Sequence, residues 1–481
     1  MYHPPIALLF LTFFLSVFRS SAQDHALARK LYDQYDRYRE NSIHDLRFKH
    51  ADIVPLVARV QGRAGMEVRQ VGQSVEGRSI NLVRFGQGKT RVLLWSQMHG
   101  DEPTATMAMM DLFNFLSASG DGFDDLRQRI RSELSLYFIP MLNPDGAEAF
   151  VRYNAIGVDL NRDAVRLQCP ESKVLKKVRD ELQPQWGFNL HDQRRVYSAG
   201  DHPHTATFSF LAPAYDPGQS VNEVRKRAMQ LVVALDQVVQ KYLPGQVGKW
   251  DDTFEPRAFG DNIQKWGTST VLIECGGLQG DPEKQEIRKL HFVLYLVAFD
   301  AIIRESFRQK TIVDYFAIPQ NDDNFFELLV RGVKVPFGSE SYLLDLGFQQ
   351  HDISYDGNRA HYQKAYLADV GDLSVFFGYE EIDGRGMTLE PGQLYPHVLE
   401  NLAALERLDP KELYRQGYTD VRLRNLPSAE ERYEQPFNLL SARSRTADND
   451  IRRGTNPGFF LVEQGVRKYA IVNGRAFRLG K

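Results

Sequence analysis

The sequence predicts an α/β protein with a mixed, mostly parallel, twisted sheet and helices on both faces, followed by a β-rich C-terminal region. Apolar strand-like runs alternate with segments of helical periodicity up to about residue 310, which is typical of a sheet covered on both faces. Beyond that point, glycine and proline interrupt short apolar segments, a pattern that indicates β structure. A chain of 481 residues is too long for one core, so we expect at least two domains.

The first 22 residues have the pattern of a signal peptide. Ile6–Phe18 is an apolar stretch, and the small residues Ser20 and Ala22 have the spacing of a site cleaved after Ala22. An uncleaved membrane anchor is the alternative. No later run reaches the roughly 20 apolar residues that are needed to cross a bilayer. We therefore expect a secreted or periplasmic protein without a membrane span in its mature chain.

Residues 23–310 contain the alternating elements. The first helix is predicted from leucines and tyrosines at helical spacing, the second begins at Pro103, a residue suited to a first helical turn, and the last strand is rich in β-branched residues. The predicted strands are 80–84, 92–96, 134–142, 187–190, 208–212 and 269–273, and the predicted helices are 24–60, 103–119, 170–182, 222–242 and 282–307.

Residues 311–481 are predicted to form a β-rich accessory region, and a division into two small units near residue 427 is left open. Its apolar segments include 328–330, 342–346 and 373–377, and one helix is expected from Pro396 to about Leu408. Near the end, Asn473-Gly474 separates two apolar runs, which is a strong signal for a tight hairpin.

Charge and cysteine content exclude some classes of protein. The net charge is −3, from 59 basic and 62 acidic residues, and no basic stripe suggests binding to nucleic acid. Only Cys169 and Cys275 are present, so there is no disulfide framework, and the sequence leaves open whether they pair. The oligomeric state is also left open.

Polar side chains that can bind a metal lie at the ends of three predicted strands. His99 and Glu102 follow the strand at 92–96, His191 follows the strand at 187–190, and Glu274 follows 269–273. In open α/β sheets, ligands bind at this edge. Two histidines and a glutamate suit zinc with an open position for water. A carboxylate that ends an apolar strand needs a metal, a partner or a proton.

With Asn143–Gly146 and the segment Arg152 to Arg162, which ends in Gly157-Val158-Asp159-Leu160-Asn161-Arg162, this set of residues resembles the zinc carboxypeptidase family of the A/B type. The resemblance covers about residues 60–310 and is closer to the bacterial and cytosolic branch. It implies one Zn²⁺ ion per chain, held by His99, Glu102 and His191.

The resemblance also implies roles for the remaining residues. Glu274 would be the general base, and Arg152 would face the carbonyl oxygen of the substrate. Asn161 and Arg162 would hold the C-terminal carboxylate, which makes the expected activity that of a carboxypeptidase acting on peptides or cell-wall peptides. Asp145 and Asp192 are candidates for orienting a ligand histidine.

Three alternatives remain open at this stage. A zinc-dependent deacylase of the aspartoacylase type has a similar His-x-x-Glu pair and a later histidine. An amidase acting on cell-wall peptides, or a binding module on a peptidase fold that has lost activity, would also fit. One departure from the family is that residues 250–254 contain no tyrosine, so capping of the substrate by a phenol is in doubt. His202 and His204 are predicted to lie in a loop.

Overall fold

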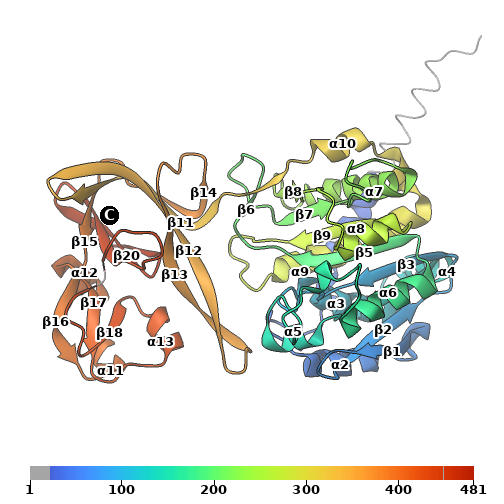
Figure 1. Ribbon diagram of the computed structural model, residues 1–481, viewed down its shortest axis with the longest axis horizontal. Helices are drawn as coiled ribbons and strands as arrows, with labels where there is room; N and C mark the ends of the chain where they lie inside the picture. The colour runs from blue at the N-terminus through green and yellow to red at the C-terminus, as the bar shows by residue number, and fades with distance from the viewer. Residues whose placement is uncertain (1–21, 448, 481) are drawn as a thin grey trace, which may run out of the picture. The chain divides into compact units, whose positions relative to one another are not determined.

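The protein is described here from a computed structural model, which defines residues 22–447 and 449–480 (Figure 1). The predicted signal peptide lies outside the described residues except for Ala22, which begins a helix over residues 22–33. The chain divides into two units, one ending at Asp322 and the other beginning at Asp323.

The first unit is built on an eight-stranded mixed sheet. The strand order is β1-β2-β4-β3-β5-β9-β7-β8, and the four central strands β4, β3, β5 and β9 are parallel. The two outer strands on one side and the β7–β9 pair on the other are antiparallel. The strands are β1 (Glu67–Gln73), β2 (Ser79–Phe85), β3 (Thr90–Trp95), β4 (Leu134–Ile139), β5 (Trp186–Asp192), β7 (Phe208–Leu211), β8 (Val247–Lys249) and β9 (Ser269–Cys275).

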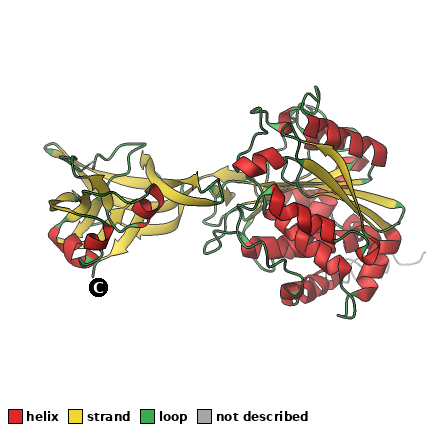
Figure 2. Ribbon diagram, turned by 90° about the horizontal axis from the view of Figure 1, so that it is seen from below, coloured by secondary structure: helices red, strands yellow, loops and turns green. Residues whose placement is uncertain are grey.

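Helices cover both faces of this sheet, which confirms the predicted fold class (Figure 2). Alternate residues of β3 enter different cores, with Val92 and Leu94 on one face and Leu93 and Trp95 on the other. The first core is closed by α3 (Thr104–Ser117), α4 (Asp124–Glu133), α7 (Glu223–Val239) and α9 (Gln285–Arg304), and the second by α6 (Pro170–Leu182) and α8 (Phe259–Lys265).

Shorter elements complete this unit. They are η1 (Tyr35–Arg37), α2 (His50–Arg59), η2 (Arg63–Gly65), α5 (Pro144–Ala149), η3 (Leu160–Arg162), β6 (Tyr197–Ala199), η4 (Ser306–Gln309), α10 (Ile312–Ala317) and β10 (Asn321–Asp323). Strand β1 and helix α4 were not among the predicted elements. Strand β1 alternates weakly because it is an edge strand with no buried residue, and α4 has strongly polar composition.

The single helix predicted for residues 24–60 is wrong, because the chain leaves helical geometry between η1 and α2. A buried ion pair of Arg288 and Asp111 explains the break. Arg288 donates to the carbonyl oxygens of Glu40 and Ile43 at 3.0 and 2.6 Å, and Asp111 accepts from the Glu40 N–H at 2.7 Å. These tertiary hydrogen bonds use backbone groups that a continuous helix would have paired internally.

The second unit is β-rich, as predicted. Its main sheet follows the order β13-β12-β11-β15-β19-β20-β21, with β14 also paired to β11, and a three-stranded sheet has the order β16-β17-β18. The strands are β11 (Phe325–Phe337), β12 (Glu340–Tyr355), β13 (Ala360–Gly371), β14 (Phe377–Asp383), β15 (Thr388–Pro391), β16 (Gln393–Leu399), β17 (Tyr418–Leu423), β18 (Asn438–Ser441), β19 (Phe459–Glu463), β20 (Val466–Val472) and β21 (Arg475–Arg478). Strands on both sides of residue 427 share the small sheet.

The helix predicted from Pro396 to about Leu408 is wrong. Residues up to Leu399 form the edge strand β16, where a proline is tolerated, and the helices are α11 (Leu402–Leu405), α12 (Pro410–Gln416) and α13 (Ala429–Glu434). The predicted hairpin is confirmed. Val472 pairs with Arg475, and both turn residues Asn473 and Gly474 have positive φ, as a type I′ turn requires.

Both cysteines are buried and free. Cys169 lies in the apolar core on one face of the first sheet and Cys275 in the core on the other face, so the sheet itself separates the two thiols. Among the described residues, no helix combines the length and the apolar character that crossing a bilayer requires.

Arg288→Met should destabilise the first unit strongly. The change leaves the Asp111 carboxylate buried without its ion-pair partner, which costs about 3 to 5 kcal/mol of unfolding free energy. The measurement is urea-induced unfolding followed by circular dichroism. Arg84→Met, which removes an exposed pair with Glu67, is the matched control and should change stability by no more than about 1 kcal/mol. Equal effects of the two changes would contradict a structural role for the buried pair.

Candidate metal centre and active site

The side chains of the candidate centre come from two parallel strand ends. His99 and Glu102 lie in the turn between β3 and α3, and His191 is the penultimate residue of β5, the neighbour of β3 in the sheet. The turn departs sharply from the strand at Gln97, which has a φ of 45°. Because parallel strands end at the same edge, the three side chains converge there.

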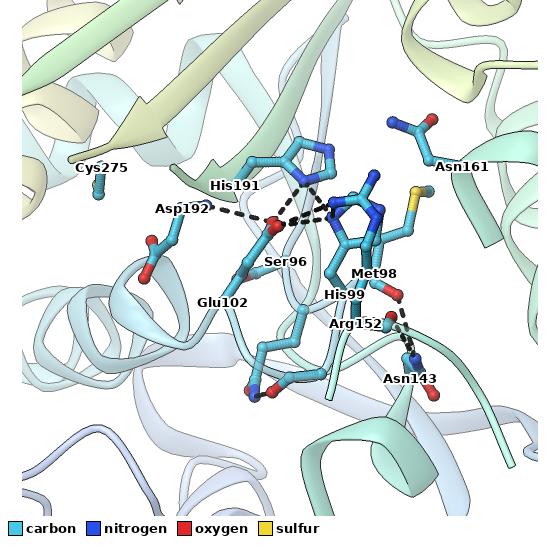
Figure 3. A network of polar contacts seen from close by, with 12 residues as sticks. Ser96, Met98, His99, Glu102, Asn143, Arg152, Asn161, His191, Asp192 and Cys275 are labelled. Carbon is cyan, nitrogen blue, oxygen red and sulfur yellow. Dashed lines mark hydrogen bonds and ion pairs between the residues drawn. The ribbon is translucent and has the colours of Figure 1, made fainter. Parts of the chain in front are cut away.

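The Asn143–Gly146 motif packs against the turn that carries His99 and Glu102. Asn143 Nδ2 donates to the carbonyl oxygen of Met98 at 3.2 Å (Figure 3). Asn143 Oδ1 accepts from the N–H of Gly146 at 2.9 Å. A Cβ on Gly100 would lie 1.9 Å from the carbonyl carbon of Gly146, so only glycine allows this approach. The motif therefore acts as a structural support of the His99 turn.

The Glu102 carboxylate lies between the two imidazoles (Figure 3). Its Oε1 is 2.7 Å from His99 Nδ1, its Oε2 is 2.7 Å from His191 Nδ1, and the two Nδ1 atoms are 3.1 Å apart. All three side chains are buried. Within the described part of the chain, this is the one group of three or more metal-binding side chains whose ligand atoms lie close enough to share an ion.

The electrostatics of the three side chains favour a positive charge among them. Burial alone would raise the pKa of Glu102, but His99 and His191 outweigh it and hold that pKa well below its usual range. Burial opposes protonation of His99, but the carboxylates of Glu102 and Asp159 raise its pKa to about 8. Burial lowers the pKa of His191, and Glu102 offsets this only in part. Either a proton or a cation must therefore compensate Glu102.

The donor set fits zinc. Two imidazole nitrogens and one carboxylate oxygen are ligands that zinc accepts at distances of about 2 Å, and atoms bound around one such ion are separated by roughly 3 Å. The observed separations of 2.7 to 3.1 Å match that spacing. The three residues predicted as metal ligands are therefore brought together in an arrangement that would hold the predicted ion.

Asp159 is a functional candidate that sequence reasoning missed. Its Oδ1 lies 3.2 Å from His99 Nε2, and its Oδ2 accepts from Arg152 Nε at 3.0 Å. A proton on His99 Nε2 leaves the Nδ1 lone pair free to bind a metal, so this carboxylate orients the ligand and the arginine together. The signal was present, because Asp159 is part of the motif that contains Asn161 and Arg162.

Arg152 lies at the partly exposed side of the ligand cluster. Its Nη1 is 3.1 Å from His99 Nδ1 and 3.4 Å from Glu102 Oε1 (Figure 3). Burial works against its charge, but the neighbouring carboxylates of Glu102 and Asp159 raise its pKa further. A permanently charged guanidinium is therefore held next to the position that a metal and its open ligand site would take.

Glu274 is adjacent to His191 across the sheet, because β5 and β9 pair these two residues in register. Its side chain is buried and has no hydrogen bond or ion pair within the described residues. Burial, with the nearby charges of Glu102 and Asp192, raises its pKa well above the usual value. Such a carboxylate is suited to accept a proton.

Asn161 and Arg162 lie on η3, next to the start of α8. Asn161 Oδ1 accepts from the N–H of Phe259 at 2.8 Å. Arg162 is 37% exposed and forms an ion pair with Glu255 at 3.4 Å. The guanidinium is therefore accessible to a ligand, although the Glu255 carboxylate already lies beside it.

Two further predictions concerned second partners of the histidines. Asp145 does not lie against a ligand histidine, since it accepts from Ser74, Arg78 and the N–H of Glu76. The side chain of Asp192 pairs with Lys284 and Thr104, while its N–H donates to Glu102 Oε2 at 3.2 Å. Asp192 thus supports the glutamate and not a histidine.

His202, His204 and residues 250–254 are the remaining candidates from the sequence. His202 and His204 are exposed in the loop between β6 and β7, as predicted. In the segment without a tyrosine, Trp250 packs edge-on against Tyr197, with ring centroids 5.2 Å apart. Tyr197 therefore supplies a phenol in this region that the family spacing did not indicate.

Comparison with known proteins finds a similarity over part of this chain. Residues 62–213 match the sequence profile described as zinc carboxypeptidase. The matched stretch contains the three candidate metal ligands, Arg152 and the Asp159–Arg162 motif, whereas Glu274 lies beyond it. Over this stretch the chain is similar to the zinc carboxypeptidase family, as the resemblance indicated, and the donor set of His99, Glu102 and His191 fits zinc.

The relatives are distant and partial. The chain is 31% identical over 144 residues to carboxypeptidase SOL1 of Arabidopsis thaliana, which covers 24% of this chain and 28% of that protein. It is 28% identical over 104 residues to carboxypeptidase 2 of Trichophyton tonsurans, which covers 22% and 19%. A metallo-carboxypeptidase structure from Burkholderia cenocepacia has 18% identity and a TM-score of 0.44, covering 54% of this chain and 70% of that one. The chain spans a third or less of the length of these curated relatives.

One zinc ion per chain is expected to bind the centre, and His191→Ala should abolish stoichiometric binding because a zinc site needs three protein ligands. Asp159→Asn should weaken binding about 10- to 100-fold, since it removes the partner that orients His99. Both are measured by competition with a calibrated chelator. His204→Ala, a change at an exposed histidine, is the control. Stoichiometric zinc in His191→Ala would contradict the assignment of the ligands.

Zinc affinity should fall as the pH drops below about 8. His99 has a pKa of about 8 without a metal, and it must release its proton before Nδ1 can bind zinc. Because zinc must displace this one proton, the apparent affinity should fall about tenfold for each pH unit below that pKa. Chelator competition between pH 5.5 and 8.5 measures the onset. Asp159→Asn, which removes one of the carboxylates that raise this pKa, should move the onset to lower pH. An affinity that stays constant down to pH 6.5 would contradict the shifted pKa.

Proposed function

We propose that this protein is a zinc-dependent carboxypeptidase that hydrolyses the last peptide bond of peptides, with residues 23–310 as its catalytic domain. The observation that carries the proposal is the convergence of His99, Glu102 and His191, with Glu274 in register beside His191 on the next strand. The N-terminal composition supports export to the periplasm or the exterior, where the substrates would be peptides or cell-wall peptides.

In this proposal, His99, Glu102 and His191 hold the ion. Bound zinc supplies two effects, since it lowers the pKa of a water in its open position and polarises the scissile carbonyl. Glu274 accepts a proton from the attacking water, whose oxygen forms the new bond to the carbonyl carbon. Glu274 then passes that proton to the amine nitrogen as the C–N bond breaks. Its burial and raised pKa support both transfers.

Arg152 stabilises the negative charge that develops on the carbonyl oxygen. Its guanidinium is held by Asp159 next to the ligand atoms, so it requires little rearrangement to donate there. Asn161 and Arg162 bind the terminal carboxylate of the substrate, in which case Arg162 exchanges its contact with Glu255 for the substrate. That grip limits cleavage to the last residue.

Glu274→Gln should lower kcat for release of the C-terminal residue about 10²- to 10⁴-fold, because glutamine cannot accept the proton of the attacking water. Zinc content should stay at one ion per chain, since Glu274 is not among the ligands. The measurement is mass spectrometry of a mixed peptide library together with metal analysis. Full turnover by the zinc-loaded variant would refute Glu274 as the base.

The same peptide library tests whether Asn161 and Arg162 bind the terminal carboxylate of the substrate. Peptides with an amidated C-terminus should be cleaved about 100-fold more slowly than free acids, because Arg162 loses its ionic partner. N-acyl amino acids are assayed beside the peptides, and hydrolysis of these compounds in place of the peptides would favour a deacylase. Cleavage at internal bonds, or equal rates for amidated peptides, would contradict the carboxypeptidase.

A further inference from the structure

Asn189 is a buried side chain whose polar atoms have no partner. It is 1% exposed, and neither Oδ1 nor Nδ2 forms a hydrogen bond within the described residues. An unsatisfied buried polar group costs about 1 to 3 kcal/mol, so a partner is to be expected from outside the chain. We propose that Asn189 recognises a neutral polar side chain, an amide or a hydroxyl, on the substrate residue that carries the free carboxylate. This inference rests on the proposed function.

The position of Asn189 in the sheet points to the site. It precedes His191 by two residues on β5, so both side chains project from the same face. In the pairing of β5 with β9, Asn189 lies beside Leu272, just as His191 lies beside Glu274. Asn189 and Leu272 are therefore neighbours on the face of the sheet that carries His191 and Glu274, two residues earlier along their strands. The second ring nitrogen of His191, Nε2, is also buried and has no hydrogen-bond partner among the described residues.

The first residues of α8 lie next to both Asn189 and Asn161, the residue proposed to bind the substrate carboxylate. A Cβ on Gly260 would lie only 3.1 Å from Asn189 Nδ2 and 3.5 Å from Pro213 Cγ, so the missing side chain leaves space above the amide. The preceding residue, Phe259, donates its N–H to Asn161 Oδ1. A terminal residue whose carboxylate is held at Asn161 and whose peptide bond lies at the metal would therefore direct its side chain toward Asn189.

The residues around Asn189 indicate which kind of substrate side chain would bind there. In the sheet, Asn189 lies between Trp95 of β3 and Leu272 of β9, and Gly260 lies next to its amide; none of these three residues carries a charge. Leu272 and its β7 neighbour Leu211 are buried but belong to neither apolar core of the sheet. A charged side chain would be buried there without a counter-ion, which is costly. An amide offers one acceptor and two donors, which complement another amide or a hydroxyl.

The test compares zinc-loaded enzymes on peptides that differ only in the last residue, which is Asn, Gln, Ser, Leu, Glu or Lys. Wild type should favour Asn over Leu, two residues of similar size. Asn189→Leu should reduce the Asn-to-Leu ratio of kcat/KM about 10- to 100-fold, because the new side chain leaves the substrate amide unpaired. Asn81→Leu, at a half-buried position on β2, is the matched control and should leave the ratio unchanged.

A second variant does not depend on the stability of Asn189→Leu. Gly260→Ala has no positive φ to oppose it and suits a helix, and its methyl group would press on the Asn189 amide. It should reduce release of Gln and Asn more than release of Ser. A further readout that needs no turnover is calorimetric binding of the same peptides to zinc-loaded Glu274→Gln, where Asn should again bind more tightly than Leu.

The outcomes separate the two proposals. Release of no C-terminal residue from any peptide would refute the proposed function, and the binding series would then decide the inference alone. An Asn-to-Leu ratio that is unchanged in Asn189→Leu, or a wild type that prefers Leu in turnover and binding, would overturn the role of Asn189 while leaving the carboxypeptidase intact. A uniform loss for all peptides in Asn189→Leu at constant ratio would also overturn it.

Discussion

One constraint governs the first unit: the carboxylate of Glu102 must lie between two imidazoles that come from different strands. A buried carboxylate is stable only if neighbouring groups that compensate its charge are held at hydrogen-bonding distance. The parallel pairing of β3 with β5 supplies that geometry, because both strands end at one edge of the sheet. The pairing of β5 with β9 then brings Glu274 beside His191.

Groups around this centre hold two of its side chains, His99 and Glu102, in place. Asp159 orients His99, the N–H of Asp192 holds Glu102, and the turn that carries His99 rests on Asn143. Lys284 joins two strand ends, since it pairs with Asp192 at 3.2 Å and donates to the carbonyl oxygen of Cys275 at 2.8 Å. The site is thus embedded in rigid sheet structure, which limits the rearrangement that binding a metal would require.

The two faces of the sheet differ in how polar their side chains are. One face is packed with apolar side chains under α3, α7 and α9. The other face is apolar at β3 but becomes polar at the ends of β5 and β9, where Asn189, His191 and Glu274 replace core residues. Polar groups at positions that would otherwise extend a core are typical of functional sites, where a sequence departs from the demands of packing.

The sequence by itself determined the order of most strands and helices, the class of fold, the terminal hairpin and a set of candidate ligands, because periodicity, turn residues and motif spacing are local properties. Only the tertiary structure decided the rest. The break after Tyr38 depends on Arg288, 245 residues beyond Ile43, and the helix expected at Pro396 yields to strand pairing. The contact of Asp159 with His99, the absence of Asp145 from that contact and the unpaired amide of Asn189 likewise arise between residues far apart in the chain. Such long-range contacts leave no periodic trace in a single sequence, since each partner alone looks like an ordinary polar residue.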